Sequence, residues 1–366
     1  MKRLLNISCC LLAVLCSGCQ SLGAKAVKTS HPQLNSAMTS SVDEQLLTNL
    51  VRLRYRENPL FLEITSINDS WRTNLDAGLD RSEILIRHES KTARGTWMGP
   101  KIMFSESQSP TVSYKPLRGK EFIKQMMTPV PLNVVLGLSE SGWKLPRVFG
   151  LCVERINNIE NAPSASGPTP YLKPNFEQFF ELTELLKEME DAHQIAIGVD
   201  NGKNLVMQLT QNGKRSPKAD RFKKLLGLDA NQDSFVFQSS FMNTASNGLV
   251  VRTRSLMSIL FYLSHAVEVP EKDIENGVVT QTVDENGQVF DWKNNASGTF
   301  LKIHCSHRFP ENVFIATKYR GNWFYIEDSD LHSKSTFMFI STLFNLQTGE
   351  ASANDVVPML ALPVGK

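Results

Sequence analysis

The sequence predicts an α+β fold built from helices and mainly antiparallel strands. Three observations carry this prediction. The chain of 366 residues is 41% hydrophobic and 21% charged, which is a globular composition. Apolar residues recur at helical spacing in some segments and alternate in others. The two kinds of segment follow one another without a βαβ rhythm, which favours α+β over a parallel sheet.

The amino terminus has the plan of a secretory signal. Lys2 and Arg3 precede an apolar run over residues 4–15, and small residues follow just before Cys19. The run is too short to cross a bilayer, which needs roughly 20 residues. We therefore expect residues 1–18 to form a signal peptide that is removed.

The stretch LCSGCQS, residues 15–21, resembles the bacterial lipobox, whose usual form is Leu-(Ala/Ser)-(Gly/Ala)-Cys, with Cys16 in the place of the Leu. The resemblance implies that Cys19 is diacylated through its sulfur and acylated on its new amine. Several acyl chains give stable anchoring, at about 0.8 kcal/mol per buried CH₂. Gln20 follows the cysteine instead of Asp, which favours sorting to the outer membrane. The alternative is an ordinary signal with an incidental cysteine.

The charge of the chain gives little information about partners. Removal of Lys2 and Arg3 leaves 37 cationic and 37 acidic side chains, a neutral balance that provides no argument for nucleic-acid binding. No later segment is long and apolar enough to span a membrane. We expect the lipid on Cys19 to be the only anchor, with the body in the periplasm. Envelope proteins are possible partners, and we expect no nucleic acid and no cofactor.

The first part of the mature chain combines a helix with strands. Residues 19–40 comprise the lipidated cysteine and a small, polar segment that predicts a flexible tether. Ser41 and Glu44 fit a capping box that starts a helix. The helix has Leu46, Leu47, Leu50, Val51 and Arg54 at helical spacing and ends at Asn58-Pro59. Residues 60–71 predict a strand, and weaker strands follow to about Tyr114.

Prolines and glycines divide the middle of the chain. After Gly119, prolines separate two or three short helices. Residues 160–174 are rich in Pro, Ser and Gly, which predicts a loop or linker. The sequence is therefore divided into an amino-terminal region, 41–159, and a carboxyl-terminal region, 175–366, which form either one domain or two.

The carboxyl-terminal region mixes both element types. Its predicted helices cover residues 176–189, 218–228, 253–269 and 333–349, the last ending at Gly349. Its predicted strands cover residues 193–200, 204–210, 234–240, 299–307, 312–328 and 358–364. Asn201-Gly202 turns the first hairpin, and Arg320-Gly321-Asn322 divides the 312–328 segment into two strands.

Four stretches resemble those of an uncharacterised group of bacterial lipoproteins. They are NLVRLRYRENPLFLEITSI, SYKPLRGKEFIKQMMTPVP with SGW, VRTRSLMSILFYLSHAVEVP, and KYRGNWFYIEDSDLHSKSTFMFISTLFNLQTGE. The resemblance covers most of the mature chain in this order and is most specific in the last stretch. It implies an envelope lipoprotein with one co-inherited architecture, and it implies no activity, ligand or catalytic residue.

The densest polar cluster lies in YIEDSDLHSKST, residues 325–336. Glu327, Asp328, Asp330 and His332 can supply ligands to a metal or a small molecule, although the spacing matches no known metal loop. The alternative is structural, because Asp and Ser are preferred where a strand leads into a helix. Strand alternation predicts that Trp323 shares a face with Tyr319, Gly321 and Tyr325, either as a glycan or peptide platform or as part of the core.

Two cysteines remain in the mature chain besides Cys19. Cys152 and Cys305 can pair in the oxidising periplasm, or both can be free thiols. Cys305 shares a predicted strand face with His307, which allows an activated thiolate, but no thiol-protease signature accompanies the pair.

The motifs favour binding over catalysis. The chain contains no nucleophile elbow, Walker loop, zinc-protease motif or dinucleotide fingerprint, and no catalytic residue is assigned. The leading hypothesis is a lipid-anchored, non-catalytic binding or assembly component of the envelope. The alternatives are a hydrolase acting on cell-wall or glycan material and a lipoprotein that binds a small ligand or metal. Both would use the cluster from Glu327 to His332.

Overall fold

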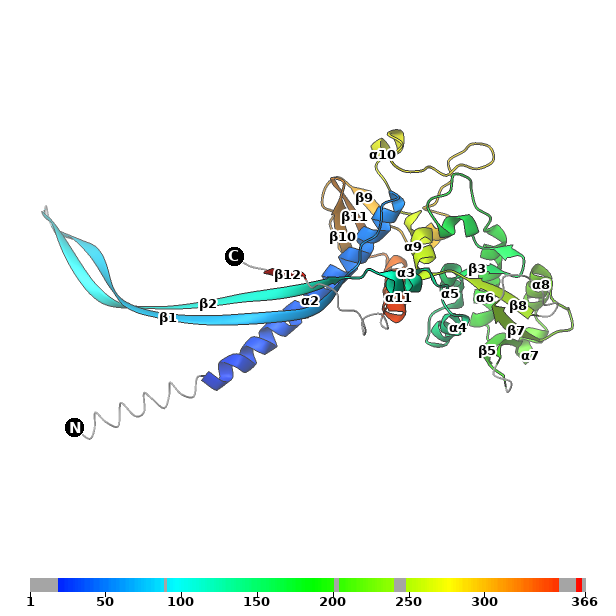
Figure 1. Ribbon diagram of the computed structural model, residues 1–366, viewed down its shortest axis with the longest axis horizontal. Helices are drawn as coiled ribbons and strands as arrows, with labels where there is room; N and C mark the ends of the chain where they lie inside the picture. Colours follow the sequence, from blue (N-terminus) through cyan, green and yellow to red (C-terminus); the bar gives the residue numbers. More distant parts are fainter. Residues whose placement is uncertain (1–18, 89–90, 201–203, 240–247, 349–359, 364–366) are drawn as a thin grey trace. The chain divides into compact units, whose positions relative to one another are not determined.

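The computed structural model describes residues 19–88, 91–200, 204–239, 248–348 and 360–363. The predicted signal peptide, 1–18, lies outside these residues. The chain divides into two units (Figure 1). The first, here called the body, comprises Met1–Phe61 and Arg118–Ala353, and the second comprises Leu62–Leu117 and Asn354–Lys366. Residues 41–61 therefore belong to the same unit as most of the carboxyl-terminal region, whereas the strands predicted after residue 61 belong to the second unit.

The second unit is a long antiparallel hairpin. Strands β1 (Leu62–His88) and β2 (Lys91–Pro116) pair along their full length, and β12 (Leu360–Pro363) adds to β2 (Figure 1). The sequence predicts strand structure here but ends the first strand at residue 71. The hairpin is longer because its Gly, Asn, Asp and Pro residues, which are typical of turns, are incorporated into the paired strands.

The body contains most of the helices. The described ones are α2 (Cys19–Arg54), α3 (Lys120–Met127), α4 (Leu132–Glu140), α5 (Leu145–Cys152), α6 (Glu177–Asp191), α7 (Gln211–Lys214), α8 (Pro217–Leu226), α9 (Leu256–Ser264), α10 (Glu271–Glu275) and α11 (Leu331–Thr348). Two 3₁₀ turns accompany them, η1 (Pro163–Ser166) and η2 (Ala296–Thr299).

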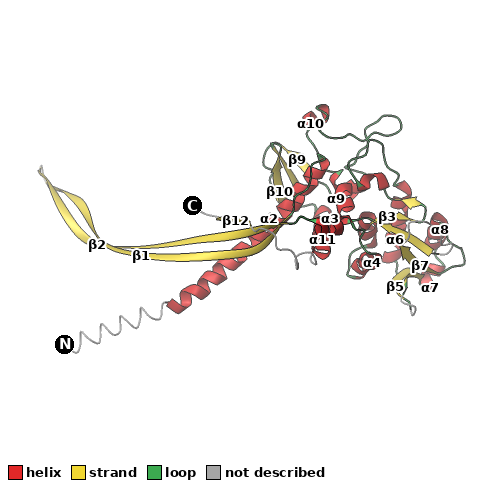
Figure 2. Ribbon diagram, in the orientation of Figure 1, coloured by secondary structure: helices red, strands yellow, loops and turns green. Residues whose placement is uncertain are grey.

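Two sheets complete the body (Figure 2). The larger sheet has the order β4-β3-β8-β7-β6-β5, with β7 and β8 parallel and the other pairs antiparallel. The smaller has the order β10-β11-β9 and is antiparallel. The strands are β3 (Val153–Ile156), β4 (Ile159–Glu160), β5 (Ile195–Val199), β6 (Leu205–Leu209), β7 (Ser234–Ser239), β8 (Gly248–Thr253), β9 (His304–Ser306), β10 (Val313–Tyr319) and β11 (Asn322–Glu327). The α+β prediction is confirmed.

Helix α2 begins earlier than the sequence suggests. The capping box predicts a start at Ser41, whereas the helix runs from Cys19 and includes the whole of the predicted 19–40 tether. A sequence pattern reveals a helix by the spacing of its apolar residues, and the sequence of residues 19–40 shows no apolar periodicity. Their Ala, Leu, Lys and Gln residues are nevertheless good helix formers.

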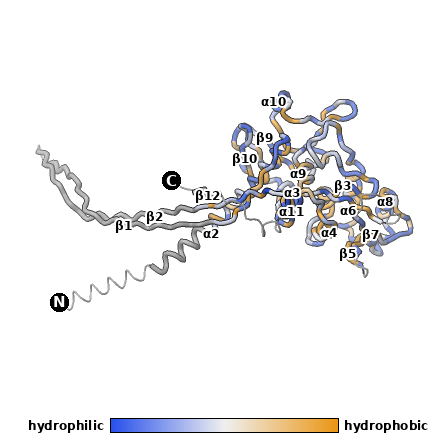
Figure 3. The backbone as a smooth tube through the Cα atoms, viewed as in Figure 1, coloured by the Kyte–Doolittle hydropathy of each residue, from blue (hydrophilic) through white to orange (hydrophobic). Residues whose placement is uncertain are grey.

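The predicted apolar face of α2 is part of the core. Leu47, Leu50 and Val51 are fully buried, and the helix packs against β10 and α9. Asn49, within the helix, holds the chain that follows it. Its side chain donates to the Leu60 carbonyl at 2.7 Å and accepts from the Leu60 N–H at 2.9 Å. Along the body, hydrophobic positions alternate with hydrophilic ones (Figure 3), as amphipathic elements require.

The segment 160–174 is a partly buried loop, and it lies within one unit of the chain. Its carbonyl groups accept hydrogen bonds from side chains of distant elements: Arg254 donates to Asn161, His265 to Ala165, Arg56 to Thr169 and Thr282 to Pro170. A Pro- and Ser-rich loop can be buried only if such donors satisfy its backbone. The sequence pattern predicts a loop or linker here, but it does not reveal these donors.

Arg254 is the most heavily bonded of these donors. Its side chain is fully buried after β8, and its Nη1 donates to the carbonyls of Gly150, Leu151 and Val153 at 3.1, 3.2 and 3.3 Å. Its Nε donates to Ser166 Oγ at 3.2 Å, and its Cζ lies 4.1 Å from the centre of the Tyr262 ring. Arg254 therefore joins the end of α5, the 160–174 loop and α9.

Candidate ligand-binding site

The predicted polar cluster is mainly a helix cap. Asp330 precedes α11, and its carboxylate accepts from the Ser333 N–H at 2.9 Å and from Ser333 Oγ at 2.6 Å. Burial opposes its charge, but these hydrogen bonds outweigh it and lower the pKa of Asp330. Asp328 accepts from Lys334 Nζ at 2.6 Å. Glu327 and His332 are exposed on either side, so the four side chains do not converge on one point.

Replacing Asp330 tests the cap. We expect Asp330→Ala to lower the free energy of unfolding by about 1 kcal/mol, because α11 loses the acceptor for its third N–H. The matched control, Glu327→Ala, removes an exposed carboxylate next to the same helix and should change stability by less than about 0.5 kcal/mol. Urea unfolding measures both. Equal effects of the two substitutions would contradict the capping role.

Trp323 lies on the half-buried face of β11, opposite Phe324 and Ile326 in the core. Tyr325 shares this face, but the predicted inclusion of Tyr319 is wrong. Tyr319 pairs with Asn322, so it lies on the core side, where its ring is 5.6 Å from that of Tyr55. Tyr319 lies on the core side because a turn of two residues, Arg320 and Gly321, separates it from Asn322.

That turn reverses the chain between β10 and β11. Arg320 and Gly321 both have positive φ, at 47° and 85°, as a tight hairpin turn requires. Strand alternation does not continue through such a turn, because pairing across the ladder decides which residues share a face.

Trp323 forms part of an open groove between α2 and β10, here called the Trp323 groove. Its volume is about 830 Å³. The Phe309 ring lies perpendicular to Trp323 at 4.9 Å, and Lys318 Nζ is 5.8 Å from the centre of the Trp323 ring. Phe309 is 60% exposed. Across the groove, burial raises the pKa of Asp43. The groove is amphipathic, with aromatic walls and charges at its edges.

The two cysteines do not pair. Cys152 is buried at the end of α5, whereas Cys305 lies in β9 opposite Phe324, and both are free thiols. Burial raises the pKa of Cys152 to about 12 and that of Cys305 to about 11. A raised pKa disfavours the thiolate, which is the nucleophilic form. Neither thiol therefore has the electrostatic environment of a catalytic cysteine.

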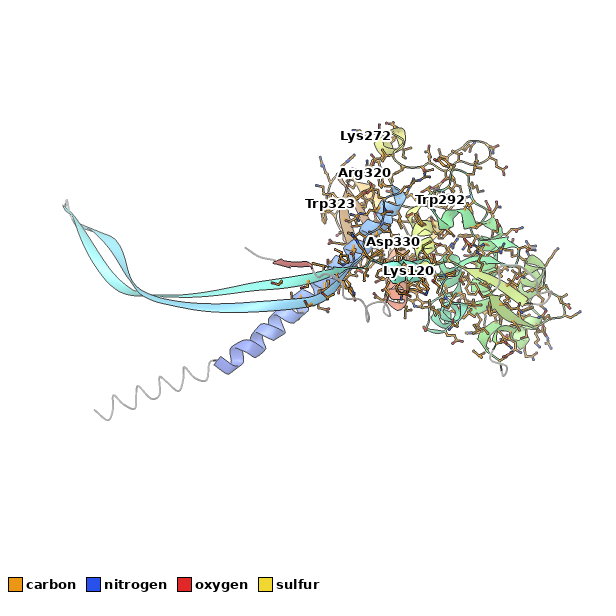
Figure 4. All side chains as sticks on the ribbon, in the orientation of Figure 1. Lys120, Lys272, Trp292, Arg320, Trp323 and Asp330 are labelled. Atoms are coloured by element: carbon orange, nitrogen blue, oxygen red, sulfur yellow. The ribbon has the colours of Figure 1, made fainter. Side chains whose placement is uncertain are left out.

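A second cavity, here called the Arg54 cavity, has a volume of about 560 Å³. Its walls include Arg54 from the end of α2, His265 after α9, and the segment 291–293. Trp292 donates from Nε1 to Thr282 Oγ1 at 2.9 Å, and its ring lies 4.9 Å from that of His265. Figure 4 labels Trp292 here and Trp323 in the other groove.

A hydrogen-bond chain connects Arg54 with His265. Arg54 Nη1 donates to Thr169 Oγ1 at 3.4 Å, and His265 Nε2 lies 2.8 Å from the Ala165 carbonyl. Because a carbonyl only accepts, Nε2 carries the proton, and Nδ1 accepts from Thr169 Oγ1 at 3.2 Å. Burial, with added repulsion from Arg54, lowers the pKa of His265 to about 3, so the ring is neutral.

Glu268 sits at the same cavity and is held as a carboxylate. It accepts from Lys293 Nζ, from His304 Nδ1 at 3.1 Å and from the Cys305 N–H at 3.2 Å. Burial opposes the charge, but these donors outweigh it and lower the pKa of Glu268 to about 2. The hydrogen bond between His304 and Glu268 also raises the pKa of His304. The negative charge of Glu268 is therefore compensated locally.

Sequence analysis did not identify the Arg54 cavity as a site. One signal was present: Arg54 falls on the face of α2 that also carries Leu47, Leu50 and Val51. A cation within an apolar stripe marks a buried charge that needs partners. Glu268, Trp292 and Lys293 gave no comparable signal, because they meet only through the fold.

Comparison with known proteins finds no matching family model, no matching curated protein and no matching solved structure. In the part of the chain that the structure describes, no three His, Cys, Asp or Glu side chains gather as metal ligands would. Across the same residues, no helix has both the length and the hydropathy for crossing a membrane.

Proposed function

We propose that this chain is a lipid-anchored protein of the bacterial envelope whose folded body binds a ligand or partner and performs no catalysis. The lipid on Cys19 would hold the protein at the membrane, most simply the outer membrane, with the body in the periplasm. Support for the anchor comes from the order of basic, apolar and small residues before Cys19.

The observation that carries the binding proposal is the pair of open cavities, each with a tryptophan in its wall. Concave sites lined by aromatic side chains and a few polar groups are where proteins bind small molecules and peptides. The Trp323 groove has a volume of about 830 Å³ and the Arg54 cavity about 560 Å³, both within the usual range of about 300–1,000 Å³.

The competing function is a hydrolase centred on residues 327–332. Glycoside hydrolysis needs two carboxylates that face one bond, one as acid and one as base or nucleophile. In this cluster Asp330 caps α11 and Asp328 pairs with Lys334, so two of the three carboxylates already have structural partners. This arrangement favours the binding proposal.

Affinity capture from crosslinked envelopes tests the proposal. The full chain is compared with Cys19→Ala and with the control Cys16→Ala, which changes a cysteine within the signal but keeps the modified one. We expect the full chain and Cys16→Ala to recover the same partner or ligand. We expect Cys19→Ala to leave the membrane fraction and to recover no partner or ligand. Recovery of the full chain without any partner or ligand would contradict the binding role.

A further inference from the structure

Arg54 is a buried cation without a counter-ion. The residue is 7% exposed, and no carboxylate among the described residues lies within ion-pair distance of it. Its Nη1 donates to the Thr280 carbonyl at 3.0 Å and to Thr169 Oγ1 at 3.4 Å. Its Nε is buried and has no partner, and no described residue accepts from its Nη2. Burial lowers the pKa of Arg54 to about 10, yet the group remains charged at neutral pH.

Arg254 provides an internal comparison. It is also buried and makes no ion pair among the residues that the structure describes, but its Nε, Nη1 and Nη2 all donate to protein acceptors. Arg254 lines neither of the two cavities, whereas Arg54 lines one. A charged group that is buried without full hydrogen bonding costs folding free energy. Arg254 therefore has a structural role, whereas Arg54 keeps hydrogen-bond donors that no described residue uses.

The donors of Arg54 that a ligand can reach are on Nη2. Nη1 is occupied and Nε is covered by protein, so the two Nη2–H groups remain. A carboxylate oxygen accepts a charge-assisted hydrogen bond from such a donor. Both acidic side chains at the cavity already have partners. Glu268 is engaged by Lys293 and His304, and Asp291 accepts from the Lys293 N–H and from Asn294 Nδ2.

Apolar side chains supply half of the residues that line the cavity. Val267, Ile274, Val289 and Phe290 line it together with Trp292, whose ring meets that of Phe290 at 4.9 Å. A ligand that fits this environment has one compact anionic group and an apolar body. An inorganic dianion such as phosphate would gain little from these walls and would find only one uncompensated cation.

We propose that the Arg54 cavity binds a small organic carboxylate, with a carboxylate oxygen on Nη2 of Arg54 and its apolar body against Trp292. The inference rests on the proposed function, in that the body binds and does not catalyse, and it names the ligand class for one of the two cavities.

Calorimetry on the purified full chain in detergent tests this site. The probes are benzoate and octanoate, with benzamide, octanol and inorganic phosphate as controls. We expect at least one carboxylate to bind and to raise the unfolding midpoint, and the uncharged analogues and phosphate to bind at least tenfold more weakly. No heat with either carboxylate would overturn the proposal, as would equal binding of the uncharged analogues or stronger binding of phosphate.

Two variants separate binding from folding. Arg54→Lys keeps a cation but removes the Nη2 donor, and we expect at least tenfold weaker carboxylate binding. Val289→Trp places a large side chain at a cavity position that is 59% exposed, leaving Arg54 intact, and should also weaken binding. Its control, Val199→Trp, changes a 64% exposed valine of β5 outside the cavity and should bind normally. Normal binding by a folded Val289→Trp would overturn the placement.

The two proposals fail in different ways. If the protein binds neither benzoate nor octanoate but still captures an envelope partner, the carboxylate site is contradicted and the proposed function is not. Loss of envelope capture with retained carboxylate binding would contradict the assembly role alone.

Discussion

Arg254→Lys is expected to destabilise the body by at least about 3 kcal/mol. A lysine ammonium cannot reach both the end of α5 and the 160–174 loop. The Leu151 carbonyl, the Asn161 carbonyl and the Ser166 hydroxyl therefore lose their donors. Each unsatisfied buried polar group costs about 1–3 kcal/mol. Urea unfolding, or the soluble yield if the variant does not fold, measures the loss.

The matched control for this prediction is Arg252→Lys. Arg252 lies two residues earlier, its side chain is half exposed, and it pairs with Glu154 at 2.7 Å. A lysine can keep that ion pair, so we expect a change of less than about 0.5 kcal/mol. If Arg254→Lys unfolds at the same urea concentration as Arg252→Lys, the role assigned to Arg254 in holding the 160–174 loop is wrong.

Glu268→Gln is expected to lower the free energy of unfolding by about 2 kcal/mol at pH 5.5, because hydrogen bonds to charged groups contribute about 1.5–3 kcal/mol. The carboxylate that accepts from Lys293, His304 and the Cys305 N–H becomes a neutral amide. Glu271→Gln, in the first turn of the exposed α10, is the control and should have little effect.

The pH dependence of this loss follows from two opposite pKa shifts. The pKa of Glu268 is lowered from 4.5 to about 2, so its contribution is present above pH 4.5 and is lost as the pH falls toward 2. The pKa of His304 is raised from 6.5, so its contribution is present below pH 6.5 and is lost as the pH rises through the raised value. The difference between wild type and Glu268→Gln should therefore be largest between about pH 4.5 and 6.5. A difference that is constant from pH 3 to 9 would contradict this ion-pair cluster.

Helices with a clear apolar face were predicted well. The sequence places a helix over 176–189, and α6 covers Glu177–Asp191, because Phe179, Leu182 and Leu186 repeat at helical spacing and are buried. The hairpin of β5 and β6 follows equally from local alternation. Its predicted turn at Asn201-Gly202 lies outside the described residues, as does the predicted stop at Gly349.

Elements without a periodic face were missed or shortened. The first half of α2 has no apolar stripe, and β1 and β2 contain many residues typical of turns. Strand β8 was not predicted, although three of its central residues, Leu249 to Val251, are buried. Its neighbours β3 and β7 come from distant parts of the chain, and such pairing is invisible to local pattern analysis.

The candidate site shows the same limit. The cluster around Asp330 is dense in the sequence, yet local capping accounts for the bonds of its carboxylate. Arg54, Glu268 and Trp292 are far apart in the chain and meet at one cavity. Composition can identify a polar stretch, but only the fold determines which buried charge lacks a partner.

The intact mass of the protein extracted from cell envelopes tests the central claim most directly, because the proposed function depends on anchoring at Cys19. We predict a chain that begins at Cys19 and is heavier than its sequence by the mass of its acyl groups, with this excess absent from Cys19→Ala. An envelope protein that begins at another residue, or that begins at Cys19 without acyl groups, would contradict the account.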